Sequence, residues 1–407
     1  MTATSHNTSP DRACWSGVLA MTLCVFALVA SEFMPVSLLT PLAHDLQVSE
    51  GLAGQGIAIS GALAVLTSLS ASRLTASLDR KSVLLGFTVL MAISGMVITF
   101  APNYSVYMVG RGLIGIVIGG FWSMSAACAM RLVPRHQVPR ALAIFNGGNA
   151  LATVISAPMG SFLAGMIGWR GAFFCLVPVA LLALVWQWAS LPAMKATSTQ
   201  NNDAHHSALG LLKNPLVLTG MAACGLFFMG QFALFTYLRP FLENVTHVSL
   251  PVLSTLLLVL GVTGFIGTLL IGSALKQGFY PTLLSIPLCM ALIAVLLIGF
   301  GHHLWLVALF LGLWGLLATS APVGWWTWVA HTLPENAEAG GGLMVAIVQL
   351  SIATGSTLGG LAFDHAGWQS TFALSGVLLI LAASLTGYTA RKAQQTGGYH
   401  PASPVIK

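Results

Sequence analysis

The sequence predicts an all-α membrane protein, with twelve transmembrane helices in two pseudo-symmetric six-helix bundles. Three observations predict this fold: a composition poor in charge, a succession of apolar segments, and a repeat between the two halves. Of the 407 residues, 56% are hydrophobic and only 6% are charged, whereas a soluble domain carries about 25% charged residues. This composition excludes a soluble protein, and the 43 glycines suit close helix packing in lipid.

The apolar segments follow one another almost without interruption, and each is close to the roughly 20 residues that cross a bilayer as a helix. The first segment is too long for the apolar core of a signal peptide, so we expect it to be retained. Strands of a barrel would instead alternate in segments of about 10 residues. The predicted spans are 14–40, 51–72, 82–101, 106–130, 140–165, 171–191, 215–238, 251–273, 282–301, 305–330, 340–362 and 369–389.

The distribution of positive charge predicts the orientation. If the N-terminus is cytoplasmic, 13 of the 16 Lys and Arg residues lie on the inner side, and the exceptions are Arg111, Arg170 and Arg239. This bias places both termini in the cytoplasm. We therefore expect a multi-pass protein of the bacterial inner membrane, surrounded by lipid. The net charge of +6 then reflects orientation, and the sequence shows no contiguous basic face of the kind that binds nucleic acid.

A polar segment rich in Ser, Thr, Asn and Ala separates the two halves and is typical of a flexible linker. The halves resemble each other at an offset of 199 residues, so that Trp169 matches Trp368 and Phe173 matches Phe372. Such a repeat predicts a site between two bundles near the middle of the membrane. The predicted divisions are an N-terminal tail (1–13), a first bundle (14–191), the linker (192–214), a second bundle (215–389) and a C-terminal tail (390–407).

Glu32 is the one acidic residue well inside an apolar span. A lone carboxylate in hydrocarbon costs about 2.5 kcal/mol or more, so such a residue usually faces a cavity or carries protons. Protonation would remove this cost and shift an equilibrium between inward-facing and outward-facing states. The alternative is a structural carboxyl group that is satisfied by Ser31 or by a helix terminus.

Arg111 lies a turn or two inside the fourth span, in the segment Gly110-Arg111-Gly-Leu-Ile-Gly115. It either extends to the membrane surface or senses the protonation of a nearby acid. In the fifth span, Gly148, Pro158 and Gly160 would bend the helix and let a neighbour approach closely. We take these three residues as candidates for conformational change, with ordinary helix kinking as the alternative.

The loop after the second span carries a charged cluster, Asp79-Arg80-Lys81. It is either a gate between helix ends or a simple anchor on the inner side of the membrane.

Several of these segments carry a family resemblance. The stretch from Ser31 to Ala43, SEFMPVSLLTPLA, resembles the Glu-Phe-x-Pro-x-x-Leu-Leu-x-x-x-Ala signature of sugar-efflux and drug–proton antiporters. Arg111 matches the fourth-helix Arg-x-x-x-Gly motif of the major facilitator superfamily. The fifth span resembles its antiporter motif, with Ala157 and Ser161 in place of two glycines, and the cluster at Asp79 retains only the last charges of its gating motif.

The resemblance to the drug–proton antiporter group covers nearly the whole chain. Two segments, Gly230–Tyr237 with Arg239-Pro240 and Pro322–Trp328, make it similar to bacterial purine-ribonucleoside efflux pumps in particular. This resemblance implies the major-facilitator fold and proton-coupled efflux of inosine-type nucleosides and purine-base analogues. Under it, Glu32 and Arg111 would couple substrate to protons.

A nucleoside needs an aromatic surface for its base, where stacking can contribute roughly 1–3 kcal/mol, and neutral hydrogen-bonding groups for its ribose and base edges. Each aromatic candidate has packing or a lipid-facing position as its alternative, whereas a buried amide is costly without a partner. The candidates at mid-helix depth are Phe121, Trp122, Ser123, Asn146, Asn149, Gln231, Phe235, Tyr237, Trp325 and Gln349.

Other specificities stay open, namely sugars and hydrophobic or cationic drugs, since the amide and aromatic content lies between what these sites favour. The adjacent His205 and His206 have no further ligand nearby, so we expect no metal and no cofactor. The sequence lacks the clustered polar residues of a membrane enzyme, and we expect none. One pathway per chain makes a monomer the default.

Overall fold

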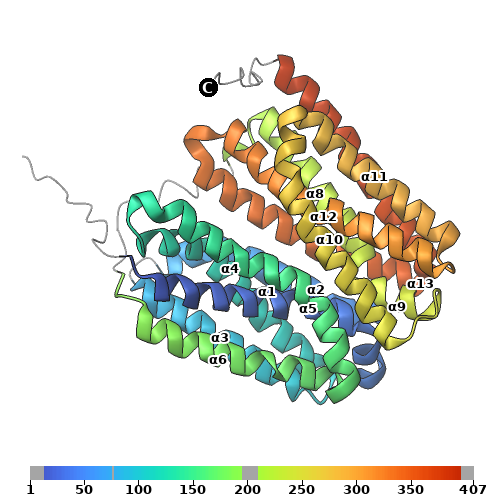
Figure 1. Cartoon of the computed structure of the whole chain (residues 1–407), viewed down its shortest axis with the longest axis horizontal. Coiled ribbons are helices and arrows are strands. Elements are labelled where there is room, and N and C mark those ends of the chain that lie inside the picture. Colours follow the sequence, from blue (N-terminus) through green and yellow to red (C-terminus); the bar gives the residue numbers. More distant parts are fainter. Residues whose placement is uncertain (1–12, 76–77, 195–209, 396–407) are drawn as a thin grey trace, which may run out of the picture.

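The computed structural model describes residues 13–75, 78–194 and 210–395, whose secondary structure is helical. The first half contains α1 (Trp15–Leu46), α2 (Glu50–Leu74), α3 (Arg80–Thr99), α4 (Tyr104–Arg131), α5 (Val138–Phe174) and α6 (Leu176–Ser190). The second half contains α8 (Pro215–Phe235), α9 (Leu238–Asn244), α10 (Leu250–Gln277), α11 (Phe279–Phe300), α12 (Leu304–Thr332) and α13 (Ala337–Gln395). The two halves form two groups of helices side by side (Figure 1). His205 and His206 lie outside the described residues.

Ten helical segments of the described chain are long and apolar enough to cross a membrane. Two of them, Arg140–Ser190 and Ala339–Gln395, have 51 and 57 residues, more than twice the roughly 20 that one crossing needs. Each is interrupted at one glycine with a φ of 77°, Gly168 in the first and Gly367 in the second. Divided at these glycines, the ten segments give twelve stretches long enough to cross a membrane, which equals the number of spans predicted from the sequence.

The two glycines also display the internal repeat, because they are separated by the predicted offset. Only glycine adopts a positive φ at little cost, so the same residue ends a helix at the same place in each half. Beside each glycine, a tryptophan packs edge-on against a phenylalanine one turn later. The ring centroids are 6.3 Å apart for Trp169 and Phe173 and 5.5 Å apart for Trp368 and Phe372.

Several helix ends differ from the predicted spans. The first helix, α1, continues past residue 40 to Leu46, and α13 continues to Gln395, so residues 390–395 are helical and extend the last helix into the segment assigned to the tail. Hydropathy reports the thickness of hydrocarbon, whereas a helix continues until a capping residue or a glycine ends it. The break between the fifth and sixth crossings lies at Gly168, while Pro158 sits within continuous helix.

Side-chain exposure on the outer helices fits a lipid environment. On α6, Leu182, Val185 and Trp188 are exposed, whereas Ala183 and Gln187 are fully buried. Large apolar residues face outward on this helix, which is the arrangement that helix packing in lipid favours. The outward surface of this helix is therefore suited to contact with lipid.

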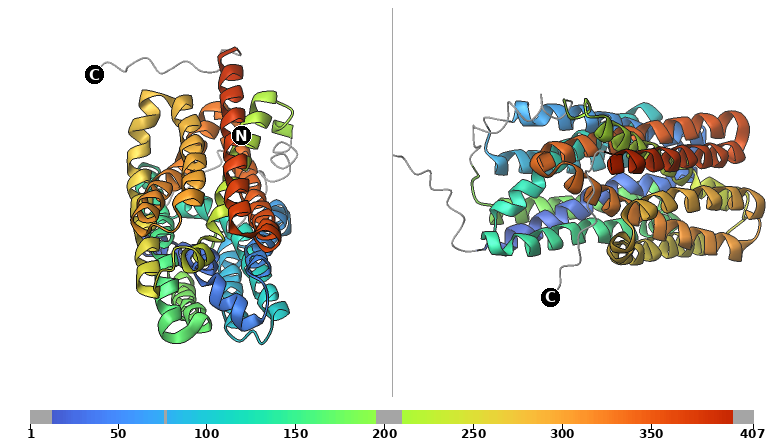
Figure 2. Two further views of the ribbon diagram at one scale, coloured as in Figure 1. Left: turned by 90° about the vertical axis from the view of Figure 1, so that its right-hand side faces the viewer. Right: turned by 90° about the horizontal axis from the view of Figure 1, so that it is seen from above.

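Three pairs of helices make the most extensive contacts between the two bundles. In Figure 2, the helices of the second half lie against those of the first in both views. Helix α2 packs on α13, α5 packs on α10, and α1 packs on α9. The bundle interface therefore contains α1 and α13, which carry Glu32 and Gln349.

Candidate functional site

Glu32 lies in the interface between the two bundles. Its side chain is buried, with 7% exposed, and its Oε1 accepts a hydrogen bond of 3.2 Å from Nε2 of Gln349. Gln349 belongs to α13, so the carboxyl group of one bundle is held by an amide of the other. A charge-assisted bond of this kind is stronger than a neutral one. The structure thus gives Glu32 a buried partner that is neither Ser31 nor a helix terminus, the two that the sequence suggested.

Arg111 is fully buried and packs against α1 and α2. Its Nε donates to the carbonyl oxygen of Gly56 at 2.9 Å, one terminal nitrogen donates to the carbonyl of Ser31 at 2.9 Å, and the other donates to Oγ of Ser60 at 3.0 Å. These bonds exclude the interpretation that Arg111 extends to the membrane surface. The guanidinium instead fixes the spacing of three helices beside Glu32.

The acceptor on α1 exists because of Pro35. In an α-helix the carbonyl of residue 31 accepts from the N–H of residue 35, and proline has none. The carbonyl of Ser31 is therefore free to accept from Arg111. The same relationship recurs further along α1, where Pro41 frees the carbonyl of Ser37 and Arg239 donates to it.

Arg111 reaches Glu32 through the main chain. Its second terminal nitrogen lies 3.4 Å from the carbonyl oxygen of Glu32, and the two ion pairs of the described residues are elsewhere, at Arg170–Asp45 and Arg239–Glu243. The carboxyl group of Glu32 is therefore bonded by an amide and sits near, but is not paired with, a fixed positive charge. Such a carboxyl can take up and lose a proton without breaking an ion pair.

An aromatic pair adjoins the polar site and also bridges the bundles. Phe33 stacks on Phe232 of α8, with ring centroids 5.9 Å apart and planes 25° apart. Phe235, one of the predicted substrate residues, packs edge-on against Phe232 at 5.8 Å. The neighbouring Gln231 has a buried Oε1 with no hydrogen-bond partner among the described residues. Phe33 and Phe232 were not predicted from the sequence, although they directly follow the predicted residues Glu32 and Gln231.

The other predicted substrate residues are scattered. Phe121 is fully buried in the core of the first bundle, and Trp122 packs edge-on against Phe145. The hydroxyl of Ser123 bonds to the carbonyl of Gly120, and the amide of Asn146 bonds to the carbonyl of Leu142. These four and the half-buried Asn149 belong to α4 and α5, and none of them is bonded to Glu32 or Gln349 in the part of the chain that the structure describes.

Two of the candidates in the second bundle have structural partners. Tyr237 is fully buried and donates to the carbonyl of Ser356 at 2.8 Å, and its ring stacks on Phe363. Trp325 is buried against Trp328. The structure thus brings Gln349 to Glu32, brings Phe235 to the aromatic pair, and gives Tyr237 and Trp325 places in the packing.

Two of the candidate conformational residues of α5 face α1. A Cβ atom on Gly148 would lie 2.5 Å from the carbonyl oxygen of Thr22, and one on Gly160 would lie 2.6 Å from Oγ of Ser37. At Gly148 the obstacle is backbone, so this glycine is required for the close approach of α5 to the helix that carries Glu32, whereas Gly160 packs against side chains of that helix. Pro158, between them in the sequence, is also buried.

The charged cluster after α2 has a capping role. The carboxylate of Asp79 accepts from the backbone N–H of Ser82, at the start of α3, and from that of Met194. Arg80 donates to the hydroxyl of Thr75 at 3.2 Å, and Lys81 follows in the first turn of α3. These contacts tie the start of α3 to the segment after α6, within one bundle.

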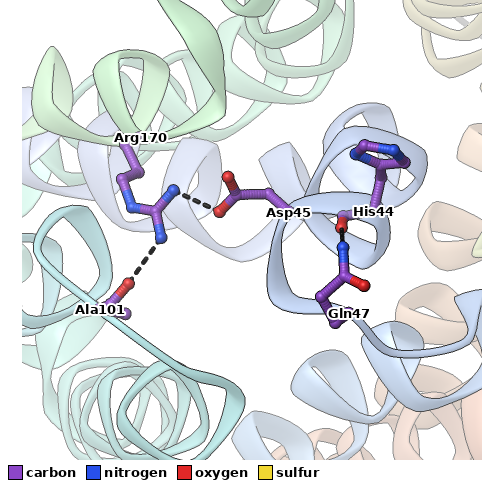
Figure 3. A network of polar contacts seen from close by, with 5 residues as sticks. All are labelled: His44, Asp45, Gln47, Ala101 and Arg170. Atoms are coloured by element: carbon purple, nitrogen blue, oxygen red, sulfur yellow. Dashed lines mark hydrogen bonds and ion pairs between the residues drawn. The ribbon is translucent and has the colours of Figure 1, made fainter.

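The two remaining basic residues outside the predicted inner side also have fixed partners. Figure 3 shows Arg170 reaching Asp45 at the end of α1 and the carbonyl of Ala101 after α3. Arg239, on α9, bonds to the carboxylate of Glu243 at 2.8 Å in addition to the carbonyl of Ser37 on α1. Arg170 braces one bundle, whereas Arg239 joins the two.

Further hydrogen bonds between the bundles lie toward the same end of the molecule as Arg239. Asp364 of α13 accepts from Oγ of Ser49 at 2.5 Å and from the N–H of Gly51 at 3.0 Å, so it caps the start of α2 across the interface. Thr357 donates to the side chain of Gln55, and Ser254 of α10 donates to Ser161 of α5. The bundles are thus joined at the end where α1 stops and α2 begins.

Comparison with known proteins identifies relatives over almost the full chain. The family model of the Major Facilitator Superfamily matches residues 21–344. A protein of Pseudomonas aeruginosa named transcription regulatory protein OpdE is 61% identical over 393 residues, which are 96% of this chain and 98% of that protein. The purine ribonucleoside efflux pump NepI of Salmonella typhimurium is 39% identical over 369 residues, 91% of this chain and 92% of the pump.

Solved structures show the same fold. A D-xylose–proton symporter superposes with a TM-score of 0.73 at 16% identity, covering 92% of this chain and 97% of that one. A point mutant of the nucleoside transporter NupG superposes with a TM-score of 0.74 at 12% identity, covering 92% of this chain and 98% of that one. At such low identity these likenesses concern the arrangement of helices alone.

Proposed function

This chain belongs to the major facilitator superfamily, and we propose that it exports purine ribonucleosides such as inosine, and purine-base analogues, in exchange for protons. The observation that carries the proposal is the buried bond between Glu32 and Gln349 across the bundle interface. A titratable group that bonds both bundles can change their relative stability when it gains or loses a proton. The similarity to the NepI pumps supports the purine ribonucleoside as substrate.

Alternating access gives the order of events. In the predicted orientation, the end where Ser49 and Arg239 join the bundles faces the periplasm, and the opposite end receives substrate from the cytoplasm. Substrate binding with release of a proton from Glu32 would precede rearrangement of the interface. A periplasmic proton would then neutralise Glu32, expel the substrate outward, and let the empty transporter return.

We assign the substrate to the part of the bundle interface that contains Phe33 and Phe232. Phe33 directly follows Glu32, and the aromatic pair that it forms with Phe232 is suited to stacking with a purine base. The unpartnered amide oxygens of Gln231 and Gln349 are acceptors for N–H and O–H groups of a base or ribose. In this proposal, Gly148, Pro158 and Gly160 form the surface on which α5 moves against α1, and the transporter acts as a monomer in the bacterial inner membrane.

A second candidate function concerns the relative named OpdE. Export of a molecule that controls gene expression would change transcription without any contact with DNA, so this transporter fold is compatible with a regulatory effect of that kind. The high identity to OpdE supports this candidate. Sugars and hydrophobic or cationic drugs are the alternative substrates of the same mechanism.

Reconstituted protein tests the proposal. In proteoliposomes with an imposed proton gradient, we expect efflux of radiolabelled inosine that collapses when the gradient is dissipated, with arabinose and a cationic dye as comparison substrates. Transport of the sugar or the dye in place of inosine would overturn the purine assignment. Inosine transport that is independent of the gradient would overturn antiport.

A further inference from the structure

Gln349 presents one end of its amide to Glu32 and leaves the other without a partner. Its Nε2 donates to Glu32, whereas its Oε1 has no hydrogen-bond partner among the described residues. The side chain is only 8% exposed, and a buried acceptor without a donor is unfavourable. Oε1 is therefore suited to receive a donor that the protein itself does not supply.

The orientation of this amide depends on the protonation of Glu32. An ionised carboxylate can only accept hydrogen bonds, so it requires the NH₂ end of the glutamine. A protonated carboxyl group can donate its O–H, and the amide oxygen then becomes the better partner. A half-turn of the terminal torsion of Gln349 exchanges the two ends, since this torsion is broad and roughly two-fold.

The surroundings leave Glu32 free to titrate as a single group. The positive charge that acts on it is Arg111 of α4, which keeps its proton in proteins and is in turn close to Tyr107. Residues 51–72, 141–169, 215–235 and 339–363 of the helices around it contain no Asp, Glu, Lys, Arg or His. Helix α9, which also packs on α1, carries Arg239 and Glu243, and these two are paired with each other. The neutral partner that can respond to Glu32 is therefore Gln349.

We propose that Gln349 is the specificity-determining residue that converts the protonation state of Glu32 into a change of substrate affinity. With Glu32 ionised, the amide oxygen of Gln349 faces the substrate and accepts from a lactam N–H such as N1–H of a 6-oxopurine. With Glu32 protonated, the amide turns, presents NH₂, and opposes the same N–H. Proton and substrate thus compete through one side chain, and the displaced proton leaves to water.

This inference rests on the proposed function for its substrate, and proton counting tests it. Purified protein in weak buffer with a pH indicator is mixed with inosine, and we expect the wild type to release about one proton per inosine bound. In Gln349→Met, which keeps the length and removes the amide, we expect roughly tenfold weaker binding, the size of a typical coupling, with no proton release. We expect 1-methylinosine, which lacks N1–H, to bind the wild type weakly and to equal inosine in the variant.

The matched control is Gln231→Met, which removes the other unpartnered amide but leaves the bond to Glu32. It should weaken inosine binding and preserve the proton released per inosine. Equal proton release in wild type and Gln349→Met would overturn the inference, as would an unchanged preference for inosine over 1-methylinosine in that variant.

A spectroscopic measurement separates this inference from the choice of substrate. Infrared difference spectra between high and low pH should show a glutamine amide band that changes together with the carboxyl band of Glu32, lost in Gln349→Met and in Glu32→Gln. If the wild type binds no nucleoside, the purine assignment is wrong, and the coupled bands still support the amide switch. A carboxyl band that changes without any amide band would overturn the switch whatever the substrate.

Discussion

Pro35 provides the acceptor that Arg111 uses. Because Pro35 has no N–H, the carbonyl oxygen of Ser31 is left without its helical donor, and Arg111 donates to it at 2.9 Å. Pro41 and Arg239 repeat the relationship at Ser37, this time across the bundle interface. The prolines of α1 thus create two attachment points for buried arginines on the helix that carries Glu32.

Arg111→Lys should destabilise the protein despite retaining the charge. Arg111 donates at once to Gly56, Ser31 and Ser60, and a lysine ammonium lacks the planar fork that reaches all three. We expect a loss of about 1.5–3 kcal/mol, the contribution of one charged hydrogen bond, measured as a lower melting temperature in detergent. Arg391→Lys, at an exposed position on α13, is the control. A melting temperature equal to that of the wild type would contradict the role assigned to the guanidinium.

Glu32→Gln should uncouple transport from protons. The variant keeps a hydrogen bond to Gln349 but cannot ionise, so we expect proton-driven inosine efflux to fall at least roughly tenfold, as when a coupling of about 1–3 kcal/mol is removed. Exchange of inosine at equal concentrations on both sides should persist. The measurement is efflux from proteoliposomes with and without a pH gradient, and full gradient-driven efflux in the variant would refute the assignment.

Cross-linking the joined end of the bundles should stop transport reversibly. Ser49 and Asp364 are in direct contact across the interface, and a disulfide between cysteines at these two positions would hold the bundles together at this end. We expect Ser49→Cys with Asp364→Cys to lose inosine transport under an oxidant and to recover it with a reductant. The two single variants and the wild type control for native cysteines. Unimpeded transport by the fully cross-linked protein would show that this end does not open.

Gly148→Ala should damage the contact between α5 and α1. The added methyl would lie 2.5 Å from the carbonyl oxygen of Thr22, a backbone atom that cannot move aside. We expect a loss of about 1–3 kcal/mol of stability, typical of overpacking, together with slower transport. Gly147→Ala is the matched control, because nothing lies within 4 Å of its added methyl. Equal melting temperatures for the two variants would contradict the close approach.

Much of the fold could be predicted because each membrane crossing is determined by the composition of one short stretch of sequence. The apolar segments, the positive charges and the repeat at Trp169 and Trp368 are properties of short stretches, and the crossings follow from them. The position of Glu32 inside an apolar span was also predictable, whereas the sequence left Arg111 open between the membrane surface and a buried site. The ends of α1 and α13 were not, because hydropathy does not sense where a helix stops outside the hydrocarbon.

The pairing of side chains was decided by the tertiary structure alone. Glu32 and Gln349 are 317 positions apart, and both were selected from the sequence, one for protons and one for substrate. No spacing along the chain indicates that they touch, because two bundles can dock in many registers that preserve the same spans. The prolines of α1 illustrate the division. The sequence determines that the carbonyls of Ser31 and Ser37 lack a helical donor, and only the packing of α4 and α9 against α1 brings Arg111 and Arg239 to them.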